Sequence, residues 1–120
     1  MKIVLDTSVL MELFERKRDV FEDCEDALEE PCSFHATQST IAELKSIAAG
    51  SGAPARAAKA CATLEGSKFS VIPSSGKADD VFFQLPKAYG IATNDKRLAA
   101  RLKEAGFIVL TQKKSGMRIA

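Results

Sequence analysis

Short apolar runs alternate along the chain with segments whose apolar residues recur at helical spacing. Five of these runs have the length of strands, and they span residues 2–5, 32–37, 69–72, 90–93 and 107–110. A first helix is predicted after a cap at Thr7 or Ser8. Further helices are predicted over about 19–30, from Ser39 or Thr40 to Gly50, over 55–64, from Asp79 or Asp80 to Ala88 and over 96–105. This alternation is typical of an α/β fold with a doubly wound, mostly parallel five-stranded sheet and helices on both faces.

The 120 residues are expected to form a single domain over 1–120. A chain of this length buries about two-thirds of its unfolded surface without disulfides, and a net charge of +1 with 46% hydrophobic residues argues against disorder. No apolar run approaches the roughly 20 residues of a membrane span, and the apolar run before Asp6 is too short for a secretory signal. We therefore expect a cytoplasmic protein with no membrane partner, whose three cysteines are reduced thiols.

The small net charge conceals two segments of opposite charge. Residues 11–30 contain six more acidic than basic residues, whereas residues 87–118 contain six more basic than acidic ones. The basic segment could attract a polyanion such as a nucleic acid, although basic helices are usually just solvated faces. Charge alone leaves both interpretations open.

Acidic residues fall where the predicted strands end or where the following helices begin. Asp6 directly follows the first strand, Asp95 follows the fourth, Glu43 lies one turn into a helix, and Asp79 and Asp80 open another helix. Because ligand sites of such sheets lie outside the carboxyl ends of the strands, we expect these side chains at one edge. Each also has a plain structural explanation, since an Asp before a helix commonly caps it and a Glu on a helix is commonly exposed.

Carboxylates that converge without basic partners repel one another and raise one another's pKa. A divalent cation stabilises such a cluster, and ligation by oxygen alone favours Mg²⁺ or Mn²⁺, which also bind substrate phosphates. Such a cation lowers the pKa of an attacking water and stabilises the leaving oxygen, so the cluster indicates hydrolysis of phosphodiester bonds. The one histidine, His35, lies within a predicted strand and is expected to be a core or edge residue.

Four blocks of sequence, taken together, resemble the PIN-domain ribonucleases. They are Asp6-Thr7-Ser8 after the first strand, Ala42-Glu43-Leu44 within a helix, Ala78-Asp79-Asp80 at a helix start and Ala92-Thr93-Asn94-Asp95 after a strand. Their order and spacing agree with the family over nearly the whole chain. The resemblance is nearer to the small stand-alone archaeal and ribosome-processing PIN domains than to the VapC toxins.

The resemblance implies a three-layer α/β/α sandwich and Mg²⁺- or Mn²⁺-dependent endonucleolytic cleavage of single-stranded RNA. It makes Asp6, Glu43, Asp80 and Asp95 the acidic quartet, with Asp6, Asp80 and Asp95 as the metal ligands. Asp79 is the alternate to Asp80, which is preferred because an apolar helix face follows it.

The resemblance also implies supporting roles for neighbouring polar residues. Thr7, Ser8 and Thr93 match the family's hydroxyl positions, which orient a carboxylate or a water, and Asn94 would help shape the last loop. The basic residues that follow Asp95 would contact RNA phosphates without reading sequence, and they are Lys96, Arg97 and Arg101.

Two features depart from the family's pattern. Pro86 lies inside the helix predicted from Asp79, where it should remove a backbone hydrogen bond and kink the helix. The basic stretch 113–118 lies beyond the last predicted strand, and the resemblance gives it no role.

Other Mg²⁺-binding α/β domains fit less well. A phosphorelay receiver needs an Asp at the end of the third strand, where Ile72 and Pro73 stand, and a haloacid dehalogenase needs one where Ser8 stands. Two alternatives within the PIN fold remain: a module that binds RNA or protein without cutting, and a toxin held by an antitoxin. A homodimer and a ribosome-processing partner also stay open.

Overall fold

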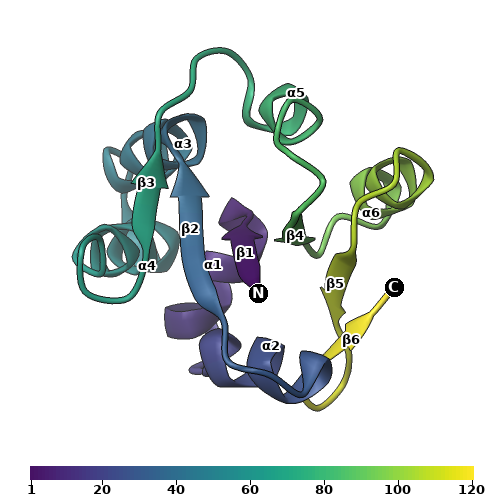
Figure 1. Cartoon of the computed structure of the whole chain (residues 1–120). Helices are drawn as coiled ribbons and strands as arrows, with labels where there is room; N and C mark the ends of the chain where they lie inside the picture. The colour runs from purple at the N-terminus through teal and green to yellow at the C-terminus, as the bar shows by residue number, and fades with distance from the viewer.

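The computed structural model describes all 120 residues, Met1–Ala120. Its six strands form one sheet in the order β3-β2-β1-β4-β5-β6 (Figure 1). The strands are β1 (Lys2–Leu5), β2 (Ser33–Thr37), β3 (Ser70–Ile72), β4 (Tyr89–Ala92), β5 (Val109–Gln112) and β6 (Met117–Ile119). β1 pairs in parallel with both β2 and β4, so the strand order reverses at β1. In an open α/β sheet this reversal is where a ligand site is expected.

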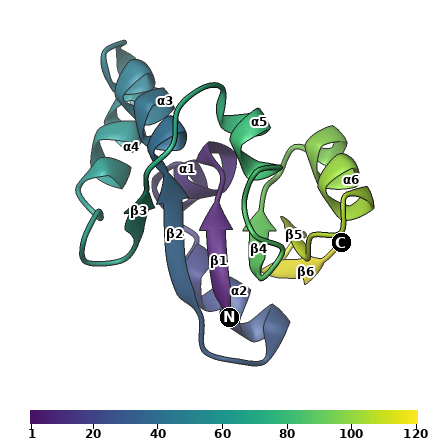
Figure 2. The ribbon, with the colours of Figure 1, turned by 45° about the horizontal axis from the view of Figure 1, so that its top comes forward.

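Six helices cover the sheet in two layers (Figure 2). They are α1 (Thr7–Glu15), α2 (Val20–Leu28), α3 (Gln38–Ala48), α4 (Gly52–Ala62), α5 (Ala78–Phe82) and α6 (Lys96–Glu104). Because side chains alternate along a strand, Ile3 and Leu5 pack beneath α1 to α4, while Val4 packs beneath α5 and α6. The α/β/α sandwich implied by the resemblance is therefore confirmed. No helix has the length and apolar character needed to cross a membrane.

The three cysteines are free, as predicted. Cys24 and Cys61 belong to the core beneath α1 to α4. Burial raises the pKa of Cys24 to about 12 and that of Cys61 to about 11. Both side chains are therefore neutral thiols that act as small apolar core residues.

The sheet has one strand more than the five predicted. After β5 the chain turns through 113–116, where Lys113 N donates to Gly116 O at 2.9 Å, and β6 returns antiparallel to β5. Gly116 adopts a φ of +99°, a conformation that glycine reaches without a steric penalty. The sequence did not reveal this hairpin because β6 has three residues, only one of them buried.

The helix predicted from Asp79 to Ala88 is shorter than expected. α5 ends at Phe82, and Gln84 N and Leu85 N donate to the carbonyls three residues earlier in tight turns. Pro86 consequently lies beyond the helix, and the predicted kink is wrong because this proline follows a finished helix. α4 begins earlier than the predicted residue 55, because it starts at Gly52 and includes Pro54 in its first turn. A proline is tolerated there because the N–H groups of the first turn have no partner within the helix.

Candidate active site

Asp6 lies between β1 and α1 and is only 7% exposed. Its carboxylate accepts three hydrogen bonds, from Thr7 N at 2.8 Å on Oδ1 and from Ser8 Oγ at 2.9 Å and Thr93 Oγ1 at 2.7 Å on Oδ2. Its backbone N donates to Ala92 O at 2.9 Å, which joins the ends of β1 and β4. The carboxylate is therefore fixed in orientation by neutral donors alone.

The loop after β4 is fastened on two sides. The fully buried Thr93 also accepts a hydrogen bond from Asp95 N at 3.2 Å, and Asn94 N donates to Ser8 Oγ at 3.1 Å. The Asn94 side chain pairs with Gln112 through Nδ2 to Oε1 at 2.6 Å and Gln112 N to Oδ1 at 3.2 Å. Sequence analysis missed Gln112, whose position opposite Asn94 depends on the pairing of β5 with β4.

Glu43 faces Asp6 from α3. Thr7 Oγ1 donates to Glu43 Oε1 at 3.1 Å, so the residue after Asp6 bridges the two carboxylates. Partial desolvation raises the pKa of Glu43, the hydrogen bond from Thr7 opposes this, and the negative charges of Asp6 and Asp79 raise it further.

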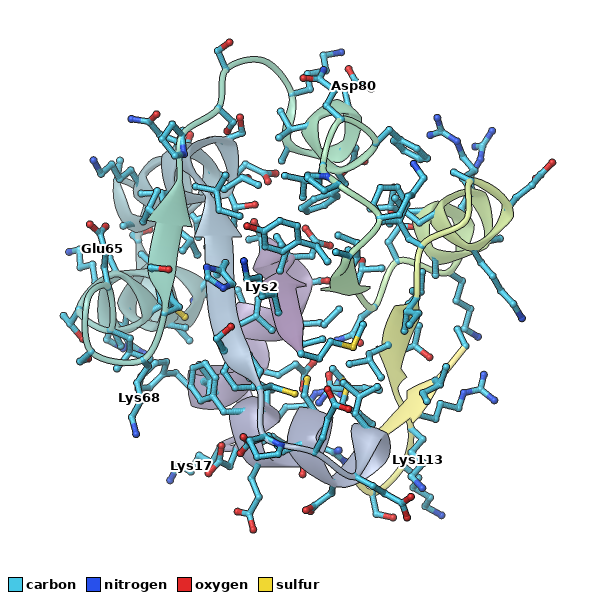
Figure 3. All side chains as sticks on the ribbon, viewed as in Figure 1. Lys2, Lys17, Glu65, Lys68, Asp80 and Lys113 are labelled. Atoms are coloured by element: carbon cyan, nitrogen blue, oxygen red, sulfur yellow. The ribbon has the colours of Figure 1, made fainter.

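Asp79 has the electrostatic environment of a site residue. Partial burial raises its pKa, as do the charges of Asp6, Asp95 and Asp80, while Arg101 opposes the shift. Both aspartates are exposed, and Asp80 points away from the sheet (Figure 3). The sequence preference for Asp80 rested on the apolar residues that follow it, but at about 100° per residue Asp80 is nearly opposite the buried face of α5, and Asp79 flanks that face. The rotation of α5 thus places Asp79 nearer to the buried face than Asp80.

Asp95 is the N-cap of α6. Its Oδ1 accepts hydrogen bonds from Arg97 N and Leu98 N, both at 3.0 Å. The expectation that an Asp before a helix caps it is therefore confirmed for this oxygen. Its other oxygen accepts no hydrogen bond from the protein, and the charge of Asp95 raises the pKa of Asp79. Asp95 therefore caps a helix and contributes charge to the cluster.

The acidic cluster, defined as Asp6, Glu43, Asp79, Asp80 and Asp95, contains no salt bridge. Its donors are oxygens only, which fits Mg²⁺ or Mn²⁺. No three acidic side chains are gathered tightly enough to hold one ion as they stand, so the cluster is an acid-lined region and not a preassembled metal centre.

The remaining predicted residues, His35 and the basic residues of α6, form no salt bridge with the acidic cluster, although the charge of Arg101 opposes the rise in the pKa of Asp79. His35 is half-buried on β2, where its ring bonds Ser70 Oγ at 2.8 Å, in agreement with a core or edge role. Arg101 lies over the Phe83 ring at 4.8 Å. Lys96 lines a groove beside α6, and neither Arg97 nor Arg101 contributes to the lining of that groove. The three basic residues predicted to bind RNA therefore do not form one patch.

Comparison with known proteins identifies the family. A family model described as a PIN like domain matches residues 3–114, so the chain belongs to this family of nuclease fold. Its structure is similar to that of the PIN domain endonuclease Utp24, with a TM-score of 0.80 and 26% identity over 98% of this chain and 90% of that one. No curated protein matches the sequence.

Two toxin–antitoxin structures share the fold at lower similarity. VapBC2 from Rickettsia felis, bound to a promoter DNA fragment, has a TM-score of 0.62 and 14% identity over 94% of this chain and 100% of that one. VapBC-1 from nontypeable Haemophilus influenzae has a TM-score of 0.58 and 14% identity, over 94% and 98%. The likeness to Utp24 exceeds both.

Proposed function

We propose that the protein is a metal-dependent endoribonuclease that hydrolyses phosphodiester bonds of single-stranded RNA. The main support for this function is the acidic cluster at the carboxyl ends of β1 and β4. In this cluster the buried Asp6 is oriented by three neutral donors and faces other carboxylates without a salt-bridge partner. Membership of a nuclease-fold family and likeness to the endonuclease Utp24 support this function.

Asp6, Asp95 and one of the two α5 aspartates would hold Mg²⁺ or Mn²⁺. We assign Asp79 as the third ligand and keep Asp80 as the alternate, because the charges of Asp6 and Asp95 act on Asp79. The ion would supply Lewis-acid activation of water and charge stabilisation at the phosphate. Glu43 would complete the site or position the attacking water through the carboxylate oxygen that Thr7 does not engage.

The hydroxyl residues position the acids. Ser8 and Thr93 hold Asp6 Oδ2, and Thr7 holds Glu43, so each acid presents a fixed oxygen to the site. Asn94 keeps the loop that leads to Asp95 in place through its pair with Gln112. Phosphate contacts are assigned to Lys96, Arg97 and Arg101 on α6, which orient the strand without reading its sequence.

A protein inhibitor is a second candidate partner for the same site. No carboxylate of the cluster forms a salt bridge, so a partner segment that inserts a basic side chain, as an antitoxin would, is electrostatically compatible with it. The fold shared with the VapBC structures supports this candidate. An inhibitor of this kind would compete with Mn²⁺ for the cluster.

A circular single-stranded RNA tests the proposal, because only an endonuclease can open a molecule without ends. The purified protein should linearise the circle with Mn²⁺ or Mg²⁺, and EDTA should stop the reaction. A circle that stays closed while a linear RNA of the same sequence is shortened would indicate an exonuclease. A circle and linear RNA that both stay intact with each ion would contradict the nuclease assignment.

A further inference from the structure

A basic groove with a volume of about 1000 Å³ lies between α6 and the β5–β6 hairpin. Cationic side chains come to it from the segment that joins α1 to α2, from α6 and from the hairpin, segments far apart in the sequence. The seven are Arg16, Arg18, Lys96, Lys103, Lys113, Lys114 and Arg118. Glu12 is the only acidic residue of the lining, and it pairs with Arg16 at 3.6 Å.

The other six cations of the basic groove have no salt-bridge partner. Acidic residues of α2 are near the hairpin, since Asp23 and Asp26 share an adjoining hollow with Lys113 and Lys114, yet no carboxylate pairs with either lysine. Like charges on a concave surface repel one another and create a positive potential that attracts an anion. The solvated face of one helix would present cations from a single segment, whereas this concave surface is lined by cations from three.

The hairpin end of the basic groove is held in place by the protein. The Arg18 guanidinium donates to the carbonyl oxygens of Lys113, at 3.3 Å, and of Lys114, which fixes the turn against the start of α2. Figure 3 shows Lys113 at this turn, at the far end of the sheet from Asp80. Arg18 therefore holds in place the turn that carries the two lysines.

Three buried polar atoms of the lining have no hydrogen-bond partner, and they are Thr111 Oγ1, Gln112 Nε2 and Glu12 Oε2. Glu12 Oε2 faces Arg16 Nε at 3.6 Å, whereas the other two have no charged partner. A buried donor without a partner costs free energy, and a bound phosphate oxygen is one group that would satisfy it.

The basic groove adjoins the acidic cluster. Asn94 lines it, and the backbone N of Asn94 donates to Ser8 Oγ, which in turn donates to Asp6. Lys96, at the same end, directly follows Asp95. A nucleic-acid strand that ran from the acidic cluster along this side would pass cationic side chains as far as the hairpin.

We propose that the basic groove binds the backbone of the single-stranded nucleic acid on one side of the scissile bond, with Lys113, Lys114 and Arg118 as the outer contacts. The identity of the polyanion as RNA rests on the proposed nuclease function. The contacts are to phosphates, so the groove adds affinity and orientation without base preference. This gives the basic stretch 113–118 its role.

Binding to a fluorescently labelled 20-nucleotide oligouridine tests the groove apart from cleavage. The measurement is made in the Asp6→Asn background over a series of salt concentrations. Replacing Lys113, Lys114 and Arg118 together by Ala should weaken binding at least about tenfold and reduce the salt slope of log K by about 2, the value for three lost contacts to a single strand. The matched control replaces Lys45, Lys59 and Lys68, three exposed lysines outside the groove, and should leave the slope unchanged.

Cleavage kinetics separate this proposal from the proposed function. In the otherwise native protein, the triple groove variant should raise KM for the 20-mer with kcat unchanged and should cut a dinucleotide as well as the native protein does. A native protein that cuts nothing contradicts the nuclease function, and the binding measurement still decides the groove.

Three outcomes of the binding measurement would overturn the groove proposal. One is equal binding by the groove variant and the lysine control, and another is no RNA binding by the Asp6→Asn protein. The third is binding of poly-glutamate as tightly as oligouridine, which would assign the groove to an acidic protein partner.

Discussion

Thr93 Oγ1 lies 2.7 Å from Asp6 Oδ2 and donates a hydrogen bond to it, although 87 residues separate the two in sequence. The same hydroxyl accepts from Asp95 N at 3.2 Å, so one buried oxygen links two acids of the cluster. Parallel pairing of β1 with β4 places Leu5 opposite Ala92 and so brings the residues that follow them together. The sheet register is therefore what assembles the site.

Thr93→Val should destabilise the protein by about 1–3 kcal/mol, because the buried Asp6 oxygen and the Asp95 N–H each lose a partner. Urea unfolding measures the loss. Thr93→Ser keeps the hydroxyl and is the matched control, so it should retain the cleavage activity that Thr93→Val reduces. Equal activity of the valine and serine variants would contradict the positioning role.

Asp79→Asn and Asp80→Asn distinguish the two α5 aspartates. Asp79→Asn should lower kcat/KM at least about 100-fold, the scale on which one charge-stabilising group acts in a site, because Asp79 interacts with Asp6 and Asp95. Asp80→Asn is the matched control, with the same loss of one charge one residue away. If Asp80→Asn is the inactive variant, the sequence preference for Asp80 is right and the structural assignment is wrong.

The pKa values of Glu43 and Asp79 are both raised in the folded protein, by desolvation first and then by neighbouring carboxylates. Between the ordinary and the raised pKa the folded state binds more protons than the unfolded state, so the free energy of unfolding falls as the pH rises through this window. Without divalent cations, the double variant Glu43→Gln, Asp79→Asn should therefore gain stability over the native protein as the pH increases from about 4 to 7.

Urea unfolding in EDTA across this pH range measures the difference between the two proteins. Saturating Mg²⁺ at pH 7 should stabilise the native protein more than the double variant, because a ligand of the folded state adds to its stability. A stability difference that is constant with pH would contradict the raised pKa values.

The sequence predicted the alternation of elements because each strand is an apolar run of few residues and each helix repeats its apolar positions. Asp6 was placed at a strand end for the same reason. The β5–β6 hairpin was not predictable in this way, since its turn is held by Arg18, which is remote in sequence, and β6 has only one buried residue. The length of α5 was misjudged because Leu85 continues the helical spacing beyond the residue where the helix ends.

Which acids meet was predictable from topology, but which oxygens are free was not. Asp95 both caps α6 and adds charge to the cluster. The order of residues alone cannot tell whether an Asp at this position has one of these roles or both. The choice between Asp79 and Asp80 depends on the rotation of a five-residue helix about its axis. The basic groove depends on three segments that meet only in the folded chain.

Cleavage of an end-labelled single-stranded RNA by the native protein and by Asp6→Asn tests the central claim, that the acidic cluster is the metal-dependent nuclease centre. Asn preserves a side-chain oxygen to cap α1, so circular dichroism should show that the variant is folded. Asp26→Asn, which removes one acidic charge from α2, is the control. We predict cleavage by the native protein and Asp26→Asn with Mn²⁺ or Mg²⁺, none with EDTA, and none by Asp6→Asn. Undiminished cleavage by a folded Asp6→Asn protein in Mn²⁺ would contradict the account.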